Sequence, residues 1–456
     1  MTALGPRLVI AGTNSGVGKT TVATGLLAAL RNRGLPVASA KVGPDFIDPG
    51  YHALATGRPG RNLDAWMCGP DVIPPLAAQA AHDAEILVIE GVMGLFDGAA
   101  DDGTGSTAHI ARLLDAPIVL VVDASAMSGS VAALVHGFAT FDPSLRIAGV
   151  VLNRVGSDGH EVMLREALAP LSVPVLGALR RDDAFAWRDR HLGLVPVVEH
   201  PNEVRAALDR LAVAIERWCD VDELDALARA APAHPVNSPL PFARRAATAP
   251  ARIALASGPA FSFVYPDSLE LLEQAGGELV PFDPTADTAL PTGVDALYAG
   301  GGFPEVFVDA LAANRPLLDD VAHRVQSGLV VWAECGGLLW LARSLDGRAL
   351  AGVVPADGHM SDRLTLGYRR ATTRTVCPVG PAGTELRGHE FHYSTLDPPG
   401  DALAMTGRFG SGCAGFASGS LLASYLHVHL AAAPAWAEHF VATAASAAGR
   451  RRDRPR

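Results

Sequence analysis

The stretch that decides the fold is Leu8-Val-Ile-Ala-Gly-Thr-Asn-Ser-Gly-Val-Gly-Lys-Thr-Thr21. It begins with the short apolar run Leu8 to Ala11, passes through a glycine-rich loop and enters helix-forming sequence that continues to Arg31. A buried strand followed by a loop and a helix is the first half of a β-α-β unit. The stretch therefore predicts that the chain opens with a parallel α/β sheet.

The loop itself has the composition of a phosphate-binding site. Small residues let backbone N–H groups curl around phosphates, the lysine neutralises the β and γ oxygens, and the threonine hydroxyl binds Mg²⁺. A threonine stands where the strict pattern requires the first glycine, a form that resembles the loop of dethiobiotin synthetase-like proteins. A glycine turn with an incidental lysine is disfavoured, because strand, loop and helix follow in the expected order. The residues expected to bind the nucleotide ATP are Gly12, Thr13, Asn14, Ser15, Gly16, Val17, Gly18, Lys19 and Thr20.

Further apolar runs without alternation follow along the first half of the chain. They are separated by segments long enough for crossover helices, which is the pattern of buried parallel strands in a doubly wound sheet. The predicted strands are Leu8 to Ala11, Pro36 to Val42, Ile86 to Glu90, Ile118 to Asp123 and Ile147 to Asn153.

Acidic residues follow two of these strands, at the edge where open α/β sheets bind ligands. Because Mg²⁺ takes oxygen ligands, we expect Thr20, Asp45 and Glu90 to hold the metal. Asp45 and Asp97 are also candidate catalytic residues, and Asp48 could serve with Asp45. The alternative for Asp45 and Asp48 is a turn aspartate that caps the next helix.

The composition of the sequence changes between residues 222 and 252, where prolines become frequent. Such a segment sustains neither a helix nor a central strand, so we interpret residues 231–250 as a linker. After it, strand-like and helix-like runs alternate again up to Ala333. The predicted fold class is thus α/β with two doubly wound domains, an ATP-binding domain at 1–230 and a second domain at 251–456.

The second half carries a candidate nucleophile, Cys335, in Leu329-Val-Val-Trp-Ala-Glu-Cys-Gly-Gly-Leu-Leu-Trp-Leu341. A cysteine between a strand and a helix meets the helix N-terminus, whose partial positive charge favours the thiolate. Glycine N–H groups are suited to an oxyanion hole, and the candidates for it are Gly301, Gly302 and Gly336. The alternative is a small buried hydrophobic residue.

Downstream, Ser424-Tyr-Leu-His-Val-His429 offers an imidazole as general acid and base. The order Gly-Gly-Gly, Glu-Cys-Gly-Gly, Tyr-x-His resembles the class I, triad-type glutamine amidotransferases, and the match to Tyr-x-His implies that His427 is the catalytic histidine. Many relatives have a glutamate where this chain has His429. The third triad position therefore stays open, with His429 either orienting His427 or packing.

Taken together, the motifs resemble the cobyrinate and hydrogenobyrinate a,c-diamide synthase family over nearly the whole chain. The resemblance implies that ATP activates the a- and c-acetate carboxylates of a corrin ring as acyl phosphates, which ammonia from glutamine then attacks. It also implies Mg²⁺ with ATP, and protected passage of ammonia between the domains. The motifs are Lys41-Val-Gly-Pro-Asp-Phe-Ile-Asp-Pro49, Gly57-Arg-Pro-Gly-Arg-Asn-Leu-Asp64, Glu90-Gly-Val-Met-Gly-Leu-Phe-Asp-Gly98, Arg190-His-Leu-Gly-Leu194, Gly300-Gly-Gly-Phe-Pro-Glu305, Gly388-His-Glu-Phe-His-Tyr-Ser394 and Ser424-Tyr-Leu-His427.

Three rivals stay open. Cobyric acid synthase and nickel-sirohydrochlorin a,c-diamide synthase share the two-domain pattern. A ParA- or MinD-like ATPase switch with an inactive glutaminase domain belongs to another class, which Cys335, His427 and the glycine run disfavour. The motif from Gly388 to Ser394 fits a structural or interface role better than a metal pair.

Composition limits the partners and the compartment. The formal charge is −11 and the only basic cluster is the terminal run from Arg450, so we expect no nucleic acid as partner. Five scattered cysteines suggest neither disulfides nor zinc, and no targeting or membrane-spanning run is evident. We expect a cytoplasmic enzyme without a membrane partner, whose substrates are a corrin dicarboxylate, ATP and L-glutamine; its oligomeric state, a homo-oligomer included, stays open.

Overall fold

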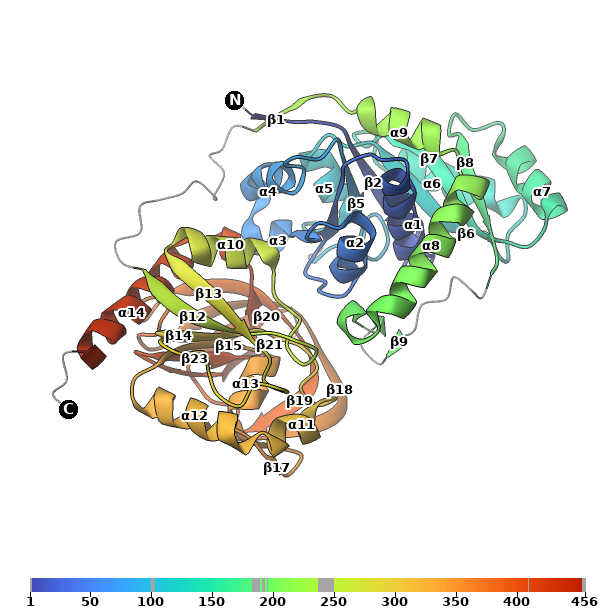
Figure 1. Ribbon diagram of the computed structural model, residues 1–456. Coiled ribbons are helices and arrows are strands. Elements are labelled where there is room, and N and C mark those ends of the chain that lie inside the picture. The colour runs from blue at the N-terminus through green and yellow to red at the C-terminus, as the bar shows by residue number, and fades with distance from the viewer. Residues whose placement is uncertain are drawn as a thin grey trace. The chain divides into compact units, whose positions relative to one another are not determined.

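The computed structural model describes residues 2–99, 103–182, 189–190, 193–194, 196–236, 250–408 and 410–452. The chain divides into two compact units, Met1–Leu240 and Pro241–Arg456 (Figure 1). Each unit has its own sheet core, and each is described by itself.

The N-terminal unit is built on a seven-stranded parallel sheet with the order β4-β3-β5-β2-β6-β7-β8. The central strands are completely buried, as their apolar runs predict. The five predicted strands are therefore confirmed. The strands of this sheet are β2 (Arg7–Gly12), β3 (Val37–Val42), β4 (Arg61–Leu63), β5 (Ile86–Glu90), β6 (Ile118–Asp123), β7 (Ile147–Val155) and β8 (Val175–Arg180).

Helices connect and cover these strands. The first of them, α1, is buried along most of its length and packs against α8 (Figure 1). Their close approach depends on Gly25, where a Cβ atom would lie 2.7 Å from Ile215 and 2.8 Å from Leu211. The helices are α1 (Lys19–Asn32), α2 (Asp48–Thr56), α3 (Ala65–Cys68), α4 (Ile73–Ala80), α5 (Thr107–Leu113), α6 (Ser130–Phe141), α7 (Asp158–Leu168), α8 (Pro201–Trp218) and α9 (Val221–Arg229).

Two short strand pairs complete this unit. β1 (Thr2–Leu4) pairs antiparallel with β11 (His234–Val236), which lies inside the stretch interpreted as a linker. The rest of that stretch, from 237 to 249, lies outside the described residues. β9 (Asp189–Arg190) pairs with β10 (Gly193–Leu194).

The C-terminal unit contains a six-stranded sheet with the order β13-β12-β14-β15-β23-β22. Its first five strands are parallel and β22 is antiparallel to β23, so the predicted α/β architecture is confirmed here too. The strands are β12 (Ala251–Ala256), β13 (Gly277–Phe282), β14 (Ala296–Ala299), β15 (Val330–Glu334), β22 (Phe416–Ser418) and β23 (Leu421–Ser424), and the helices are α10 (Pro266–Gln274), α11 (Val308–Ala313), α12 (Arg315–Gln326), α13 (Gly336–Leu341) and α14 (Ala435–Arg452).

The same unit holds a second, mainly antiparallel sheet that the sequence reading did not anticipate. Its longest strands bury alternate residues, the pattern of a sheet with one packed face, and this period of two was the available signal. The strands are β16 (Ala342–Leu345), β17 (Arg348–Ala349), β18 (Val354–Thr373), β19 (Glu385–Asp397), β20 (Leu403–Gly407), β21 (Gly410–Ala414) and β24 (His427–Val428).

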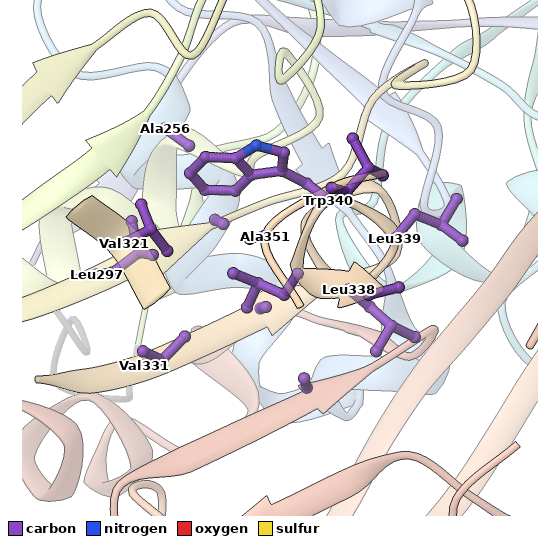
Figure 2. Packing of buried hydrophobic residues seen from close by; sticks show 14 of the residues in the cluster. Ala256, Leu297, Val321, Val331, Leu338, Leu339, Trp340 and Ala351 are labelled. Carbon is purple, nitrogen blue, oxygen red and sulfur yellow. The ribbon is translucent and has the colours of Figure 1, made fainter. Parts of the chain in front are cut away.

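The core of this unit packs around Trp340 on α13, which is fully buried (Figure 2). Its indole ring lies 5.5 Å from that of Phe261 and 6.3 Å from that of Phe282, between centroids. Because α13 directly follows Cys335, this packing anchors the chain on the helical side of the candidate nucleophile. Among the described residues, no helix combines the length and apolar character needed to cross a bilayer.

Candidate functional site

The phosphate loop joins β2 to α1 and depends on glycine at Gly18. Gly18 has φ of 97°, and a Cβ atom there would lie 2.1 Å from the side-chain nitrogen of Asn153. That nitrogen donates a hydrogen bond to the carbonyl of Val17 at 2.8 Å. The end of β7 thus holds the loop in place, through a residue that the sequence reading had placed in a strand without a role.

Lys19 is the first residue of α1 and is 7% exposed. Its Nζ donates to the carbonyl oxygens of Asn14, at 3.0 Å, and Met93, at 2.5 Å. Burial, reinforced by repulsion from Lys41, lowers the pKa of Lys19 to about 8. The lysine is still mainly cationic at pH 7 and lies over the loop from which it was predicted to bind phosphate.

Glu90 ends β5 and is completely buried in a network of polar contacts. Its Oε1 accepts hydrogen bonds from Thr20 Oγ1 and from Lys41 Nζ, both at 2.7 Å. Its Oε2 lies 2.6 Å from His52 Nε2. Burial by itself raises the pKa of Glu90, but Lys41 and His52 outweigh it and hold that pKa well below its usual range. Glu90 is therefore a carboxylate at neutral pH.

The two aspartates after β3 have different surroundings. Asp48 lies in the first turn of α2, with Oδ2 2.6 Å from Lys41 Nζ and 3.3 Å from Thr20 Oγ1. Asp45 accepts the N–H of Ile47 at 2.8 Å and lies 4.0 Å from Lys41 Nζ. Asp48 thus faces the network directly, whereas Asp45 also closes the turn that starts the helix, as its alternative interpretation expected.

Asp97 closes a turn at the same edge. Its Oδ2 accepts the N–H of Gly94 at 2.8 Å, and its charge acts on Lys19. Of the loop that follows, Asp101 and Asp102 lie outside the described residues.

The oxygen atoms at this edge fit Mg²⁺ bound together with phosphate. The hydroxyl of Thr20 and the carboxylates of Asp48 and Glu90 converge, and a nucleotide-bound Mg²⁺ takes only one or two protein carboxylates. Within the described ranges, no group of three or more His, Cys, Asp or Glu side chains could hold a metal alone. The donor set is that of a metal shared with a substrate.

Cys335 lies at a sharp turn between β15 and α13. Its φ of 48° is in the left-handed region, a strained conformation for a residue with a side chain. The turn is held because its N–H donates to the carbonyl of Ser424 at 2.8 Å and its carbonyl accepts from Leu339 at 3.1 Å. We refer to this turn, Glu334 to Gly336, as the cysteine elbow.

Cys335 is buried, with only 5% of the residue exposed. Burial raises the pKa of Cys335, Glu305 raises it further, and a hydrogen bond from the Gly336 N–H opposes them. The Gly336 N–H, at the start of the six-residue helix α13, thus acts in the direction expected of a helix N-terminus, and burial acts against it.

The glycine turn from Gly300 to Gly302 packs against the elbow. A Cβ atom on Gly336 would lie 3.0 Å from the nitrogen of Gly302, and Gly337 donates to the carbonyl of Gly300 at 2.9 Å. The N–H of Gly301 is used in a hydrogen bond to Phe263 at 3.1 Å. The N–H of Gly301 is therefore already occupied, whereas that of Gly336 is directed to the thiol and the nitrogen of Gly302 lies beside Gly336.

His427 begins β24 and is 1% exposed. Its Nδ1 lies 3.7 Å from Oε2 of Glu334, and a Cβ atom on Gly301 would lie 2.3 Å from its Cε1 and 3.1 Å from its Nε2. Burial, with His392 adding to it, lowers the pKa of His427 to about 3. The ring is thus neutral and has its Cε1–Nε2 edge at the glycine turn.

His429 has other contacts. Its Nε2 lies 3.8 Å from Asp267, and its Nδ1 accepts the N–H of Ala431 at 3.3 Å. Its ring lies 4.7 Å from that of Tyr265, between centroids. These contacts fit the packing alternative for His429 better than the orienting one.

The motif from Gly388 to Ser394, whose chemistry the sequence left open, lies on β19 beside β24. His389 stacks on His427 with ring centroids 4.9 Å apart, and its Nε2 lies 3.1 Å from the hydroxyl of Tyr265. Glu390 accepts a hydrogen bond from Arg369 at 2.8 Å. The motif thus supports the histidine that the sequence selected.

Several contributing residues were missed. Lys41 was quoted only within a motif, although a lysine near the end of an apolar strand indicates a buried partner. His52 and Asn153 gave no local signal, because their partners lie 38 and 136 residues away along the chain. Glu334 directly precedes Cys335 in the sequence, but nothing local indicates that it faces His427.

Comparisons with known proteins agree with this geometry. Residues 8–194 match the family described as CobQ/CobB/MinD/ParA nucleotide binding domain, and residues 252–435 match the CobB/CobQ-like glutamine amidotransferase domain. Two relatives are called hydrogenobyrinate a,c-diamide synthase. That of Streptomyces coelicolor is 49% identical over 96% of this chain and 97% of its own, and that of Thermobifida fusca 46% identical over 96% of each. A cobyrinate a,c-diamide synthase of Syntrophotalea carbinolica is 45% identical over 96% of this chain and 98% of its own.

Proposed function

The chain belongs to the family of hydrogenobyrinate and cobyrinate a,c-diamide synthases, and we propose that it uses ATP and glutamine to amidate the a- and c-acetate carboxylates of a corrin ring. The observation that supports this most directly is the presence of two separate sites. One is a charged phosphate loop in the N-terminal unit. The other, in the C-terminal unit, combines the buried Cys335 with His427, which lies beside Glu334. The relatives named for this activity match the chain over nearly its full length.

In the N-terminal unit, the residues act on ATP and on the acceptor carboxylate. Lys19 is placed to neutralise the β- and γ-phosphate oxygens while the γ-phosphoryl group passes to the carboxylate. Mg²⁺ would be held by Thr20 with Glu90 and Asp48 or Asp45, and would supply further positive charge at the phosphates. Asp97 keeps the loop after β5 in place, close enough to act on the charge of Lys19.

In the C-terminal unit, the sulfur of Cys335 attacks the side-chain amide carbon of glutamine while His427 accepts the thiol proton. The oxyanion is stabilised by the N–H groups of Gly302 and Gly336. His427 then gives the proton to the departing nitrogen, which leaves as ammonia, and water hydrolyses the thioester to glutamate. Ammonia attacks the acyl phosphate, and phosphate leaves.

The division of labour is tested with Cys335→Ala. Because this change removes only the nucleophile, glutamine-driven amidation should fall to background while amidation driven by ammonium chloride stays within about threefold of wild type. The measurement is product mass after incubation with ATP, the corrin substrate and either nitrogen source. Loss of both activities in a folded variant would contradict the proposal.

The acceptor is tested by substrate competition. The protein is incubated with ATP, glutamine and one of four acceptors: hydrogenobyrinate, cobyrinate, nickel-sirohydrochlorin, or a corrin that already carries the a- and c-amides. Only hydrogenobyrinate and cobyrinate should gain two amides. Mass gain on the other compounds would favour the rival synthases. The same assay with and without EDTA tests the proposed need for Mg²⁺.

A further inference from the structure

Besides Cys335 and His427, a triad-type glutaminase site has a third residue that orients the histidine, and the sequence leaves this position open. Glu334 immediately precedes the nucleophile, and its Oε2 lies 3.7 Å from Nδ1 of His427. Both side chains are almost completely buried, with exposed fractions of 3% for Glu334 and 2% for His427. The candidate that the sequence had considered, His429, is instead next to Asp267.

The fold places this carboxyl group and the nucleophile together. Glu334 ends β15 in parallel register with Ser424 on β23, and the next residue, Cys335, donates its N–H to the carbonyl of Ser424. The chain then runs from Ser424 through two residues to His427. The same pair of strands therefore positions the carboxyl group, the thiol and the imidazole.

The imidazole has different neighbours on its two sides. Nδ1 faces Glu334, whereas the Cε1–Nε2 edge faces Gly301, whose carbonyl carbon lies 3.3 Å from where a Cβ atom on Gly336 would be. With Nδ1 directed to a carboxylate, the ring proton is held on Nδ1 and the Nε2 lone pair is left for the proton of Cys335. This is the tautomer that a general base requires.

Burial of the Glu334 carboxyl group is unfavourable for folding, and this argues against a purely structural role. Within the described residues, its Oε1 has no hydrogen-bond partner, and the backbone N–H of Val428 is the donor that opposes the effect of burial. A buried carboxyl group with an unsatisfied oxygen costs more than an apolar side chain of similar size. Residues that lower stability in this way are typical of functional sites.

We propose that Glu334 is the positioning residue of the glutaminase site, its carboxylate fixing the tautomer of His427 and stabilising the imidazolium formed when Cys335 gives up its proton. The inference rests on the proposed glutamine chemistry and adds the residue that orients the base.

Burial raises the pKa of Glu334 to about 8, which makes the role observable. Tyr298, His427 and Cys335 are the titratable groups that face it, and His389, His392 and Glu390 surround the imidazole. When Glu334 is protonated, its negative charge no longer favours the tautomer with the proton on Nδ1, and the base is lost. When it is ionised, the base is available.

The test uses Glu334→Gln, Glu334→Asp and the matched control Asp267→Asn, which changes another buried acid beside a histidine. For glutamine hydrolysis, Glu334→Gln should lower kcat roughly 100-fold with KM changed less than about threefold, because only the orientation and charge of the base are lost. Glu334→Asp should recover part of kcat, and Asp267→Asn should stay within about threefold of wild type.

The pH profile is the readout that a structural role would not move. Wild-type kcat should rise between pH 7 and 9, and this rise should disappear in Glu334→Gln. A Gln variant with the wild-type rate and profile, or one altered only in KM, would overturn the inference. If Glu334→Gln does not fold, two other results would overturn the inference. One is a wild-type kcat that does not change between pH 7 and 9, and the other is full activity of Glu334→Asp with an unchanged pH profile.

Controls separate this inference from the proposed function. Ammonium-driven amidation should be at the wild-type level in all three variants. If Cys335→Ala still hydrolyses glutamine, the proposed function fails. If Cys335→Ala is inactive and Glu334→Gln is normal, only the role of Glu334 fails.

Discussion

The two candidate sites occupy the same kind of position and are built in opposite ways. Each lies where a parallel strand of a doubly wound sheet turns into a helix, at Lys19 after β2 and at Cys335 after β15. In the N-terminal unit, ion pairs hold the pKa of Glu90 below its usual range and that of Lys41 above it, although burial raises the pKa of Asp48 and lowers that of Lys19. In the C-terminal unit, burial brings Glu334 and His427 toward their neutral forms.

The difference follows the chemistry. Phosphoryl transfer involves large negative charges, and a site that already carries fixed opposite charges stabilises them without reorganisation. Glutamine hydrolysis moves single protons between neighbouring groups, and this requires groups that can exchange a proton. The same topology thus supports a site of fixed charges and a site of mobile protons.

The largest effect is expected for Lys19→Ala. Removing the fixed charge over the loop should lower both glutamine- and ammonium-driven amidation by about 10³-fold or more, since charge stabilisation dominates phosphoryl transfer. Glutamine hydrolysis without acceptor should persist, as an assay of glutamate release would detect. Arg33→Ala removes an exposed cation just beyond the other end of α1 and should change amidation less than twofold.

Glu90→Gln breaks the buried network itself. Lys41 and His52 would lose a charged partner at 2.7 and 2.6 Å, so we expect about 3–5 kcal/mol lower free energy of unfolding for the N-terminal unit and roughly 100-fold slower amidation. Urea unfolding followed by circular dichroism measures the first quantity and product mass the second. Asp123→Asn, which removes a partly exposed acid paired with Arg154, should cost under about 1 kcal/mol. Equal costs for the two variants would contradict the prediction.

Gly301→Ala tests the packing of the proton-transfer site. The new methyl group would lie 2.3 Å from Cε1 of His427 and must displace the ring, so glutamine hydrolysis should slow roughly 10- to 100-fold. Ammonium-driven amidation should not change. Gly419→Ala is the matched control, because no atom lies within 4 Å of its added carbon. An unchanged rate of hydrolysis in Gly301→Ala would show that the histidine does not need this position.

The smallest effect concerns stability and pH. The pKa of Glu334 rises from 4.5 to about 8 on folding, so its native form keeps a proton that the unfolded chain releases above pH 4.5. Its contribution to stability is therefore present below pH 4.5 and lost as pH rises to about 8. Glu334→Gln removes this loss. The Tm of Glu334→Gln minus that of wild type, measured by calorimetry, should therefore increase by a few degrees between pH 5 and 8.5. A difference that stays constant over this range would contradict the raised pKa of Glu334.

The sequence by itself determined the elements whose causes are local. Apolar runs such as Ile86 to Glu90 are buried strands because they have no polar alternation, and a loop such as Gly12 to Thr20 must bend at its glycines. The second sheet of the C-terminal unit does not follow from continuous apolar runs, because strands such as β19 alternate between buried and exposed residues.

Only the tertiary structure decided which groups meet. Asn153 supports the phosphate loop across 136 residues, His52 reaches Glu90 across 38, and Glu334 faces His427, 93 positions along the chain. It also decided that Cys335 is buried, which raises the pKa of its thiol. Residue type and neighbours in the chain specify what a side chain can do, whereas pairing and desolvation depend on strands that fold together from distant segments.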